Sequence, residues 1–344
     1  MKKLNPDQKY FVDEFYEDYR AGLMTRRVFI KKLAFIAGSM TATVSIMGML
    51  GCSPEEIPEA TEPMPTPEVP AAEPAATEPP ATEPSEPTPE PTSAPSSAGL
   101  TPVPGAQSPF SVPEGDPTLE TSNVMLTSQG DEISGYLARP IEAGQYPAVL
   151  VCHENRGLND HIRDVTRRFA KEGYVALALD LLSREGGTEN LDPDQVPGLL
   201  GDAGPDRHEA DFIAAFDYLQ GLDFVDGERI GMTGYCFGGG VTWQVATALP
   251  ELKAAVPFYG RSPDLEEVPN IEAAVLGVYA ELDERINAGI DPLEQALTEA
   301  DITYQINVYP GVNHAFHNDT SQRYVEEQAT QAWLDTLAWF ETYL

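Results

Sequence analysis

The stretch Arg229-Ile230-Gly231-Met232-Thr233-Gly234-Tyr235-Cys236-Phe237-Gly238-Gly239-Gly240 sets a single cysteine between glycines, directly after a strand-like run. This pattern is typical of a nucleophile elbow, in which a strand turns sharply into a helix and holds one reactive side chain in a strained backbone conformation. Gly234 and Gly238 leave room where the strand and the helix cross at close range. The stretch therefore predicts that Cys236 is presented at the end of a strand.

On both sides of this turn, apolar runs of strand length alternate with amphipathic runs of helix length. An opening hairpin is expected from 124–126 and 133–137, with the turn at 128–131. Further strands are expected at 148–152, 174–181, 230–233, 254–258, 275–279 and 304–309, and helices at 161–172, 207–220, 238–247, 292–300 and 323–343. Such alternation predicts an α/β fold with a mainly parallel sheet covered by helices on both faces. A hairpin followed by a parallel series is what the α/β-hydrolase architecture would give.

Two further residues follow strands in the way that Cys236 does. Asp283 comes after the strand expected at 275–279, and His314 comes after the strand expected at 304–309. Reactive groups of such sheets gather beyond the carboxyl ends of the strands, and nucleophile, acid and histidine stand in the α/β-hydrolase order. Each residue alone has an ordinary structural explanation. Together they predict a catalytic triad in which the imidazole accepts the thiol proton and the carboxylate fixes its tautomer.

The loop after the strand expected at 148–152 reads His153-Glu154-Asn155-Arg156-Gly157. In this architecture the loop supplies one backbone donor of an oxyanion hole, and the residue after the nucleophile supplies the other. The expected donors are therefore the backbone N–H groups of Asn155 and Phe237.

The His153-Glu154-x-x-Gly157 loop, the Gly234-Tyr235-Cys236-x-Gly238-Gly239 elbow, the Asp283 loop and the run Gly311-x-x-His314-Ala315-Phe316 together resemble the dienelactone hydrolase family, over about residues 120–344. The resemblance implies hydrolysis of a carboxylic ester or lactone through an acyl-enzyme on Cys236. It also implies that Glu154 contacts the resting thiol and helps to deprotonate it; the alternative is that Glu154 only orders its loop.

One position departs from the family. Members of the muconate pathway carry an arginine four residues after the catalytic histidine, where it helps to bind the substrate carboxylate, whereas this chain has Asn318. Arg156 and Arg261 are the replacement cations considered, with Tyr259 and Phe316 as further candidates for contact with substrate. Two alternatives follow: a general carboxylesterase or thioesterase acting on neutral substrates, or a surface lipoprotein that uses the fold only to bind.

The N-terminal part has the pattern of a targeting signal. Thr25-Arg26-Arg27-Val28-Phe29-Ile30-Lys31 and the apolar run 33–50 resemble a twin-arginine export signal, which would make the export machinery a partner. Cys52 follows Met49-Leu50-Gly51 as in a lipoprotein cleavage box, so lipidation of Cys52 is expected, with an uncleaved span as the alternative. Either outcome places the enzyme outside the cytoplasm and anchored to the membrane. Residues 1–24 would be a short cytosolic extension with a helix at 6–22.

Residues 53–108 contain 16 of the 31 prolines together with Glu, Thr, Ala and Ser, which predicts a solvated, extended tether ahead of a catalytic domain at 109–344. A peptide-recognition role is the alternative for this tether.

The net charge is −34, and residues 111–344 alone carry 13 basic and 40 acidic groups. Such a surface repels nucleic acid, so a nucleic-acid partner is not expected.

Apart from Cys52, the chain has only Cys152 and Cys236, so no disulfide framework is expected. The two cysteines end strands that should be neighbours, which raises oxidative pairing as a hypothesis; the alternative is that Cys152 is a core thiol. The other four histidines lack metal-ligand spacing, and zinc, phosphate-loop and dinucleotide motifs are absent from the sequence. Neither a metal nor a cofactor is therefore expected. Those histidines are His153, His161, His208 and His317.

Overall fold

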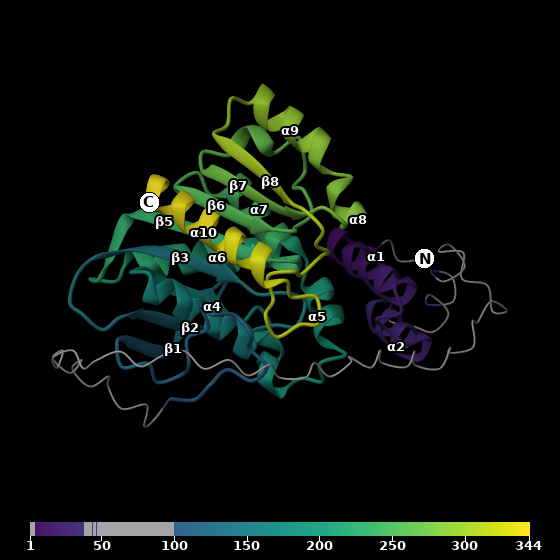
Figure 1. The fold of residues 1–344 in the computed structure, drawn as a ribbon, viewed down its shortest axis with the longest axis horizontal. Coiled ribbons are helices and arrows are strands. Elements are labelled where there is room, and N and C mark those ends of the chain that lie inside the picture. The colour runs from purple at the N-terminus through teal and green to yellow at the C-terminus, as the bar shows by residue number, and fades with distance from the viewer. Residues whose placement is uncertain (1–3, 38–42, 44–45, 47–99) are drawn as a thin grey trace, which may run out of the picture.

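The computed structural model describes residues 4–37, 43, 46 and 100–344. Its centre is an eight-stranded sheet in the order β1-β2-β4-β3-β5-β6-β7-β8 (Figure 1). The strands are β1 Leu119–Ser128, β2 Asp131–Pro140, β3 Tyr146–Cys152, β4 Val175–Leu179, β5 Val225–Tyr235, β6 Ala254–Phe258, β7 Ala274–Ala280 and β8 Tyr304–Tyr309.

The sheet joins an antiparallel edge to a parallel series. β1 and β2 form the predicted hairpin, β2 pairs antiparallel with β4, and all other neighbours are parallel. Every residue of β4, β6 and β7 is buried, which is typical of parallel strands covered on both faces. The predicted α/β-hydrolase fold is confirmed.

Helices cover both faces of the sheet (Figure 1). α4 and α10 lie on one face, where Phe169 packs on Trp333 at a ring distance of 4.6 Å and on Phe340 at 5.9 Å. α6 and α7 contact each other and β5 on the other face. The helices of this part are α4 Asp160–Lys171, α5 Val196–Ala203, α6 Pro205–Gln220, α7 Phe237–Ala248, α8 Glu284–Asn287, α9 Ile290–Glu299 and α10 Glu326–Tyr343.

Most expected elements are present, but β1 and β5 each begin five residues before the strands expected from residues 124 and 230, and the helices differ as well. The last helix begins at Glu326 rather than at residue 323, and the sequence did not predict α5 or α8. Pro and two Gly residues in α5 are poor helix formers. This helix forms because its buried side packs against α1 and α2, so tertiary contact overrides weak local preference.

Two N-terminal helices, α1 Pro6–Arg20 and α2 Arg26–Ala37, lie against the catalytic part beside α5 and α8 (Figure 1). α1 confirms the helix expected at 6–22, with Asn5 and Gln8 forming a capping box. None of the helices in the described part of the chain is long and apolar enough to cross a membrane. Cys52, the tether up to residue 99 and most of the apolar run 33–50 beyond residue 37 lie outside the described residues, so the domain boundaries stay a prediction.

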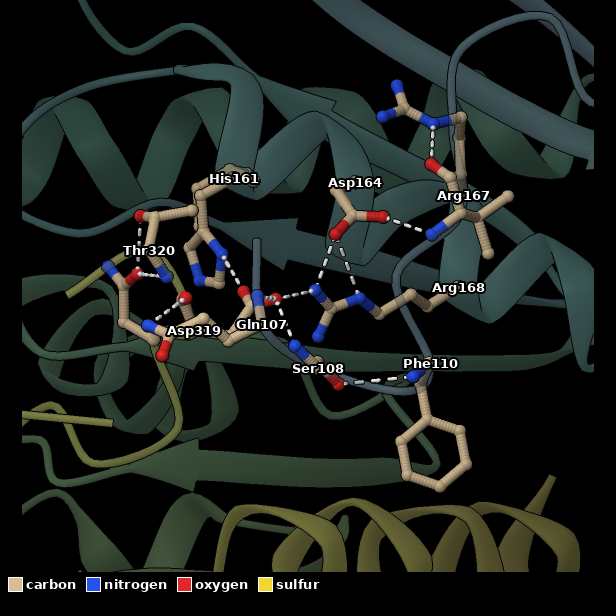
Figure 2. A network of polar contacts seen from close by, with 12 residues as sticks. Gln107, Ser108, Phe110, His161, Asp164, Arg167, Arg168, Asp319 and Thr320 are labelled. Carbon is tan, nitrogen blue, oxygen red and sulfur yellow. Dashed lines mark hydrogen bonds and ion pairs between the residues drawn. The ribbon is translucent and has the colours of Figure 1, made fainter. Parts of the chain in front are cut away.

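A buried ionic network secures the segment that holds the predicted catalytic histidine (Figure 2). Asp319 accepts hydrogen bonds from the backbone N–H groups of Gln107 (3.2 Å) and Ser108 (3.0 Å), from Arg168 (2.9 Å) and from His161 (3.0 Å). These bonds tie the segment before β1 and the helix α4 to the loop that follows β8. The position of the histidine loop is therefore set by contacts on the face of the sheet opposite α7.

Candidate active site

Cys236 lies at the sharp turn between β5 and α7. Its backbone has φ 60° and ψ −118°, outside the regions that L-residues ordinarily adopt. A Cβ atom on Gly234 would lie 2.2 Å from the carbonyl oxygen of Gly238, and one on Gly238 would lie 2.5 Å from the carbonyl oxygen of His153. Only glycine fits at these two positions, so the predicted elbow geometry is present.

The histidine and the acid predicted from the sequence are in direct contact. His314 Nδ1 lies 2.6 Å from Asp283 Oδ2, and both side chains are buried. Asp283 is also the N-cap of α8 and accepts from the backbone N–H of Ile286 at 3.3 Å. The cap and the imidazole together fix the carboxylate in place.

The thiol of Cys236 faces the imidazole from the other side. The sulfur and a ring nitrogen of His314 belong to a group of atoms that all lie within 4.8 Å of one another. His314 Nε2 is buried and has no hydrogen-bond partner among the described residues. This nitrogen is therefore the one that can exchange a proton with the sulfur, at a distance that a small rotation of side chains can close.

Burial and charge set the protonation of these groups. Burial alone would raise the pKa of Asp283, but the charge and the hydrogen bond of His314 outweigh it and hold that pKa below its usual value. Burial opposes a charged imidazole, yet Asp283 and the Cys236 sulfur raise the pKa of His314 well above its usual value. Burial raises the pKa of the Cys236 thiol, a nearby carboxylate adds to the rise, and His314 opposes it.

That carboxylate is Glu14 of α1, a residue that the sequence analysis did not select. Glu14 Oε1 lies 3.7 Å from the Cys236 sulfur and accepts a hydrogen bond of 2.6 Å from Asn155 Nδ2. The hydroxyl of Tyr10, one turn earlier in α1, lies 3.3 Å from the same sulfur. A signal for Glu14 existed in the sequence, because it lies three residues after Phe11, on the same helix face.

Glu154, predicted to contact the resting thiol, has another partner. Its Oε2 accepts a hydrogen bond of 2.5 Å from Asn318 Nδ2, the residue that stands where family members carry arginine. Asn318 in turn accepts from the backbone N–H and the hydroxyl of Thr320. In this structure the acid next to the sulfur is Glu14, and the role of Glu154 stays a prediction.

The expected oxyanion donors lie beside the nucleophile. Phe237 is the first residue of α7, so its N–H has no acceptor within that helix. Asn155 lies in the loop after β3, and its side chain reaches the same group of residues through Glu14. Their function as donors stays a prediction.

The four candidates for substrate contact differ in position. Tyr259 is buried, has φ 37° and places its ring 4.9 Å from that of His314. Phe316 is fully buried behind Tyr259, Arg156 is exposed, and Arg261 pairs with Asp7 of α1. Tyr259 is thus the one that contacts the triad.

The hypothesis of oxidative pairing concerns Cys152 and Cys236. Cys152 and Cys236 are both free and buried, and Cys152 pairs with Gly234 in the β3–β5 register. The Cys152 sulfur lies 3.8 Å from the carbonyl oxygen of His153. Oxidative pairing of the two thiols stays a prediction.

Glu14, Cys236 and His314 are the described residues that could together hold a metal ion, each offering one ligand atom. The sequence did not anticipate this group, because Glu14 lies far from the other two in the chain. Two of the three ligands are the proposed nucleophile and its base, so a metal bound here would compete with catalysis.

The other four histidines have different partners. These are the backbone oxygen of Glu154 for His153, the carboxylate of Asp319 for His161, the backbone oxygen of Leu200 for His208 and the ring of Tyr235 for His317.

Comparison with known proteins agrees with this geometry. The model of the dienelactone hydrolase family matches residues 133–344. The chain belongs to the dienelactone hydrolase family. It is therefore an enzyme of the ester and lactone hydrolase class, as the sequence predicted.

Individual relatives match 65–72% of this chain over nearly all of their own length. A protein of Salmonella typhi, named as a candidate carboxymethylenebutenolidase, is 34% identical over 72% of this chain and 96% of its own length. A protein of Synechocystis with the same name is 35% identical over 66% of this chain and 98% of its own. A crystal structure of a candidate dienelactone hydrolase from Klebsiella pneumoniae aligns with TM-score 0.61 and 35% identity, covering 65% of this chain and 99% of that one.

Proposed function

We propose that this dienelactone hydrolase family member cleaves a carboxylic ester or lactone through an acyl-enzyme on Cys236. The observation that carries the proposal is the arrangement in which Asp283 holds His314 by Nδ1 while Nε2 faces the sulfur of the elbow cysteine. A thiol, an imidazole and a carboxylate in this order are the parts that nucleophilic acyl transfer requires.

The reaction begins with transfer of the thiol proton to His314 Nε2. The thiolate attacks the carbonyl carbon, and the backbone N–H groups of Phe237 and Asn155 stabilise the oxyanion. The tetrahedral adduct collapses, the C–O bond breaks, and His314 returns the proton to the leaving alkoxide. In a lactone this alkoxide stays attached to the acyl group.

Water completes the cycle. His314 removes a proton from a water molecule, and the hydroxide adds to the thioester carbonyl. The second adduct expels the Cys236 thiolate and releases the carboxylic acid, and His314 returns its proton to the sulfur. Asp283 keeps the proton on Nδ1 throughout, so that Nε2 serves as base and then as acid.

The relatives named as candidate carboxymethylenebutenolidases favour a lactone as substrate, whereas Asn318 in place of the family arginine favours a neutral ester. Turnover of matched esters with and without a carboxylate group decides between these two classes. A general carboxylesterase prefers the neutral member of each pair. A dienelactone hydrolase prefers the charged member.

We further propose export by the twin-arginine route and anchoring at Cys52. The proposal is supported by the paired Arg26 and Arg27, the apolar run after them and the Pro/Glu-rich segment that follows. Mass spectrometry of the mature protein tests it. A lipid-modified N-terminal Cys52 supports lipoprotein processing, and an intact Met1 supports the uncleaved span.

The catalytic proposal is tested by ester hydrolysis with the Phe11→Glu chain, in which the packing of α1 over the thiol is weakened. The same chain is measured with Cys236→Ala added and after thiol alkylation, and we expect each of these changes to abolish turnover. Equal rates with and without Cys236 in this background would overturn the proposal and favour a fold retained for binding.

A further inference from the structure

We propose that the surface around the thiol, made by Phe237, Arg261, Arg285 and Arg323 and here called the rim, binds a helix. Its occupant is α1, and substrates cannot reach Cys236 while α1 is bound. The inference goes beyond the proposed function, because it concerns access to the thiol. Its consequence for turnover rests on the proposed function.

The helix fills the space in which an acyl group would react. Tyr10 Oη and Glu14 Oε1 lie 3.3 Å and 3.7 Å from the nucleophilic sulfur. Cys236 is 3% exposed and His314 is 4% exposed. A carbonyl carbon must approach the sulfur to about 3 Å for attack, and the two side chains of α1 stand in that place.

Charge complementarity secures the helix on the rim. Three arginines, one from the loop after β6, one from α8 and one from the loop before α10, each pair with an acid of α1. The pairs are Arg261 with Asp7, Arg285 with Glu17, and Arg323 with Asp18. In a chain with net charge −34, a rim that offers three arginines selects an acidic occupant.

Apolar packing and hydrogen bonds hold the same helix on the side that faces α7 and α5. Phe11 is fully buried, and its ring lies 5.2 Å from that of Phe237, the residue after the nucleophile. At the start of the helix, Asn5 Nδ2 donates to the carbonyl oxygen of Gly201 at 2.7 Å, and Gln8 Nε2 donates to Asp202 at 2.7 Å. The helix is therefore held at its start, its middle and its end.

Two hollows flank the helix. One of about 170 Å³ includes His314, Asp283 and Glu14 in its wall, and one of about 610 Å³ includes Pro6 and Arg261. Residues of α1 form part of the wall of both hollows. Release of α1 would therefore enlarge both.

The position of α1 in the chain supplies a trigger. The helix precedes the paired arginines, so cleavage before Cys52 during export would separate it from the catalytic part. The enzyme would then stay closed before export and open afterwards.

The test uses the full chain as wild type, as Phe11→Glu and as the control Lys9→Glu, whose side chain is exposed on the same helix. Alkylation of Cys236 by iodoacetamide is followed by mass spectrometry of the peptide that contains it, and hydrolysis of a nitrophenyl ester is followed in parallel. We expect Phe11→Glu to speed alkylation at least about tenfold, since a buried phenylalanine contributes more than that factor to docking. Lys9→Glu should match wild type.

Equal alkylation rates in wild type and Phe11→Glu would overturn the inference. Faster alkylation without ester hydrolysis in any chain would support α1 as the occupant and overturn the proposed function instead. Asp18→Arg and Arg323→Glu provide a check that does not depend on Phe11. Each alone should speed alkylation and the pair together should slow it again, whereas additive acceleration would count against docking.

Discussion

At the scale of the residue, backbone hydrogen bonds fix the conformation of Cys236, whereas its surroundings set the pKa of its thiol. Its N–H donates to the carbonyl oxygen of Phe258 at 3.0 Å, and its own carbonyl accepts from the N–H groups of Gly239 and Gly240. These bonds hold the left-handed φ of 60° and so aim the sulfur. The pKa of the Cys236 thiol is raised above its usual value mainly by burial; Glu14, from a distant segment, adds to the rise and His314 opposes it.

Asp283→Asn tests the carboxylate at this scale. Asparagine keeps an acceptor for the cap of α8 but loses the charge that holds the His314 tautomer, so we expect kcat to fall by about a thousandfold or more with little change in fold. Steady-state hydrolysis in the natural chain and in the Phe11→Glu background measures the effect. Glu284→Gln, an exposed neighbour, should leave kcat unchanged, and an active Asp283→Asn enzyme would remove the aspartate from the mechanism.

At the scale of the element, the crossing of β5 and α7 decides whether the nucleophile is presented. The helix begins directly after Cys236, and the backbone of Gly238 passes next to the carbonyl groups of Cys152 and His153. Because backbone atoms line the contact on both sides, no side chain can move aside to admit a methyl group. The two strands β3 and β5 and the helix must therefore keep this spacing.

Gly238→Ala tests the crossing. The added Cβ would lie 2.5 Å from the His153 oxygen and 2.6 Å from the Cys152 oxygen, so we expect a loss of about 2–3 kcal/mol in the free energy of unfolding, together with loss of turnover. Gly221→Ala is the matched control, since its Cβ would meet nothing closer than 3.5 Å. Chemical denaturation followed by circular dichroism compares the two, and equal stability would show that the crossing can relax.

At the scale of the whole molecule, two distant contacts complete the site. α1 reaches the sulfur across 222 positions of sequence, and Asp319 joins the segment before β1 and the helix α4 to the histidine loop (Figure 2). Burial alone would raise the pKa of Asp319, but the hydrogen bond from His161 and the charge of Arg168 hold it well below its usual value. The ionised carboxylate is therefore the form that stabilises the fold.

Asp319→Asn tests this network. The substitution leaves buried Arg168 with Asp164 as its remaining carboxylate partner, and we expect a loss of about 2–4 kcal/mol. Because the folded pKa is the lower one, the contribution of Asp319 is present above the ordinary aspartate pKa near 3.8 and is lost as the pH falls below it. Denaturant titrations from pH 3 to pH 7 should therefore show the gap between wild type and variant narrowing toward acid. Asp226→Asn, which removes a surface pair with Arg229, should cost much less, and a gap that did not change with pH would contradict the account.

The pattern of residues within short segments was enough to predict the sheet and the order of the triad residues. Strand and helix periods, the glycines around Cys236 and the strand-end positions of Asp283 and His314 are properties of short segments, so each could be predicted without knowing what packs on it. Helix α5 could not, because its eight residues favour a helix only when α1 and α2 cover them.

The groups around the thiol depended on the folded chain. Glu14 lies beside the sulfur, and Glu154 turns to Asn318 instead. These pairings bring together segments more than 150 positions apart, and nothing in either segment specifies the other. Hydrophobic and charge patterns tell which face of a segment is buried, whereas the partner of that face is decided by the packing of the whole molecule.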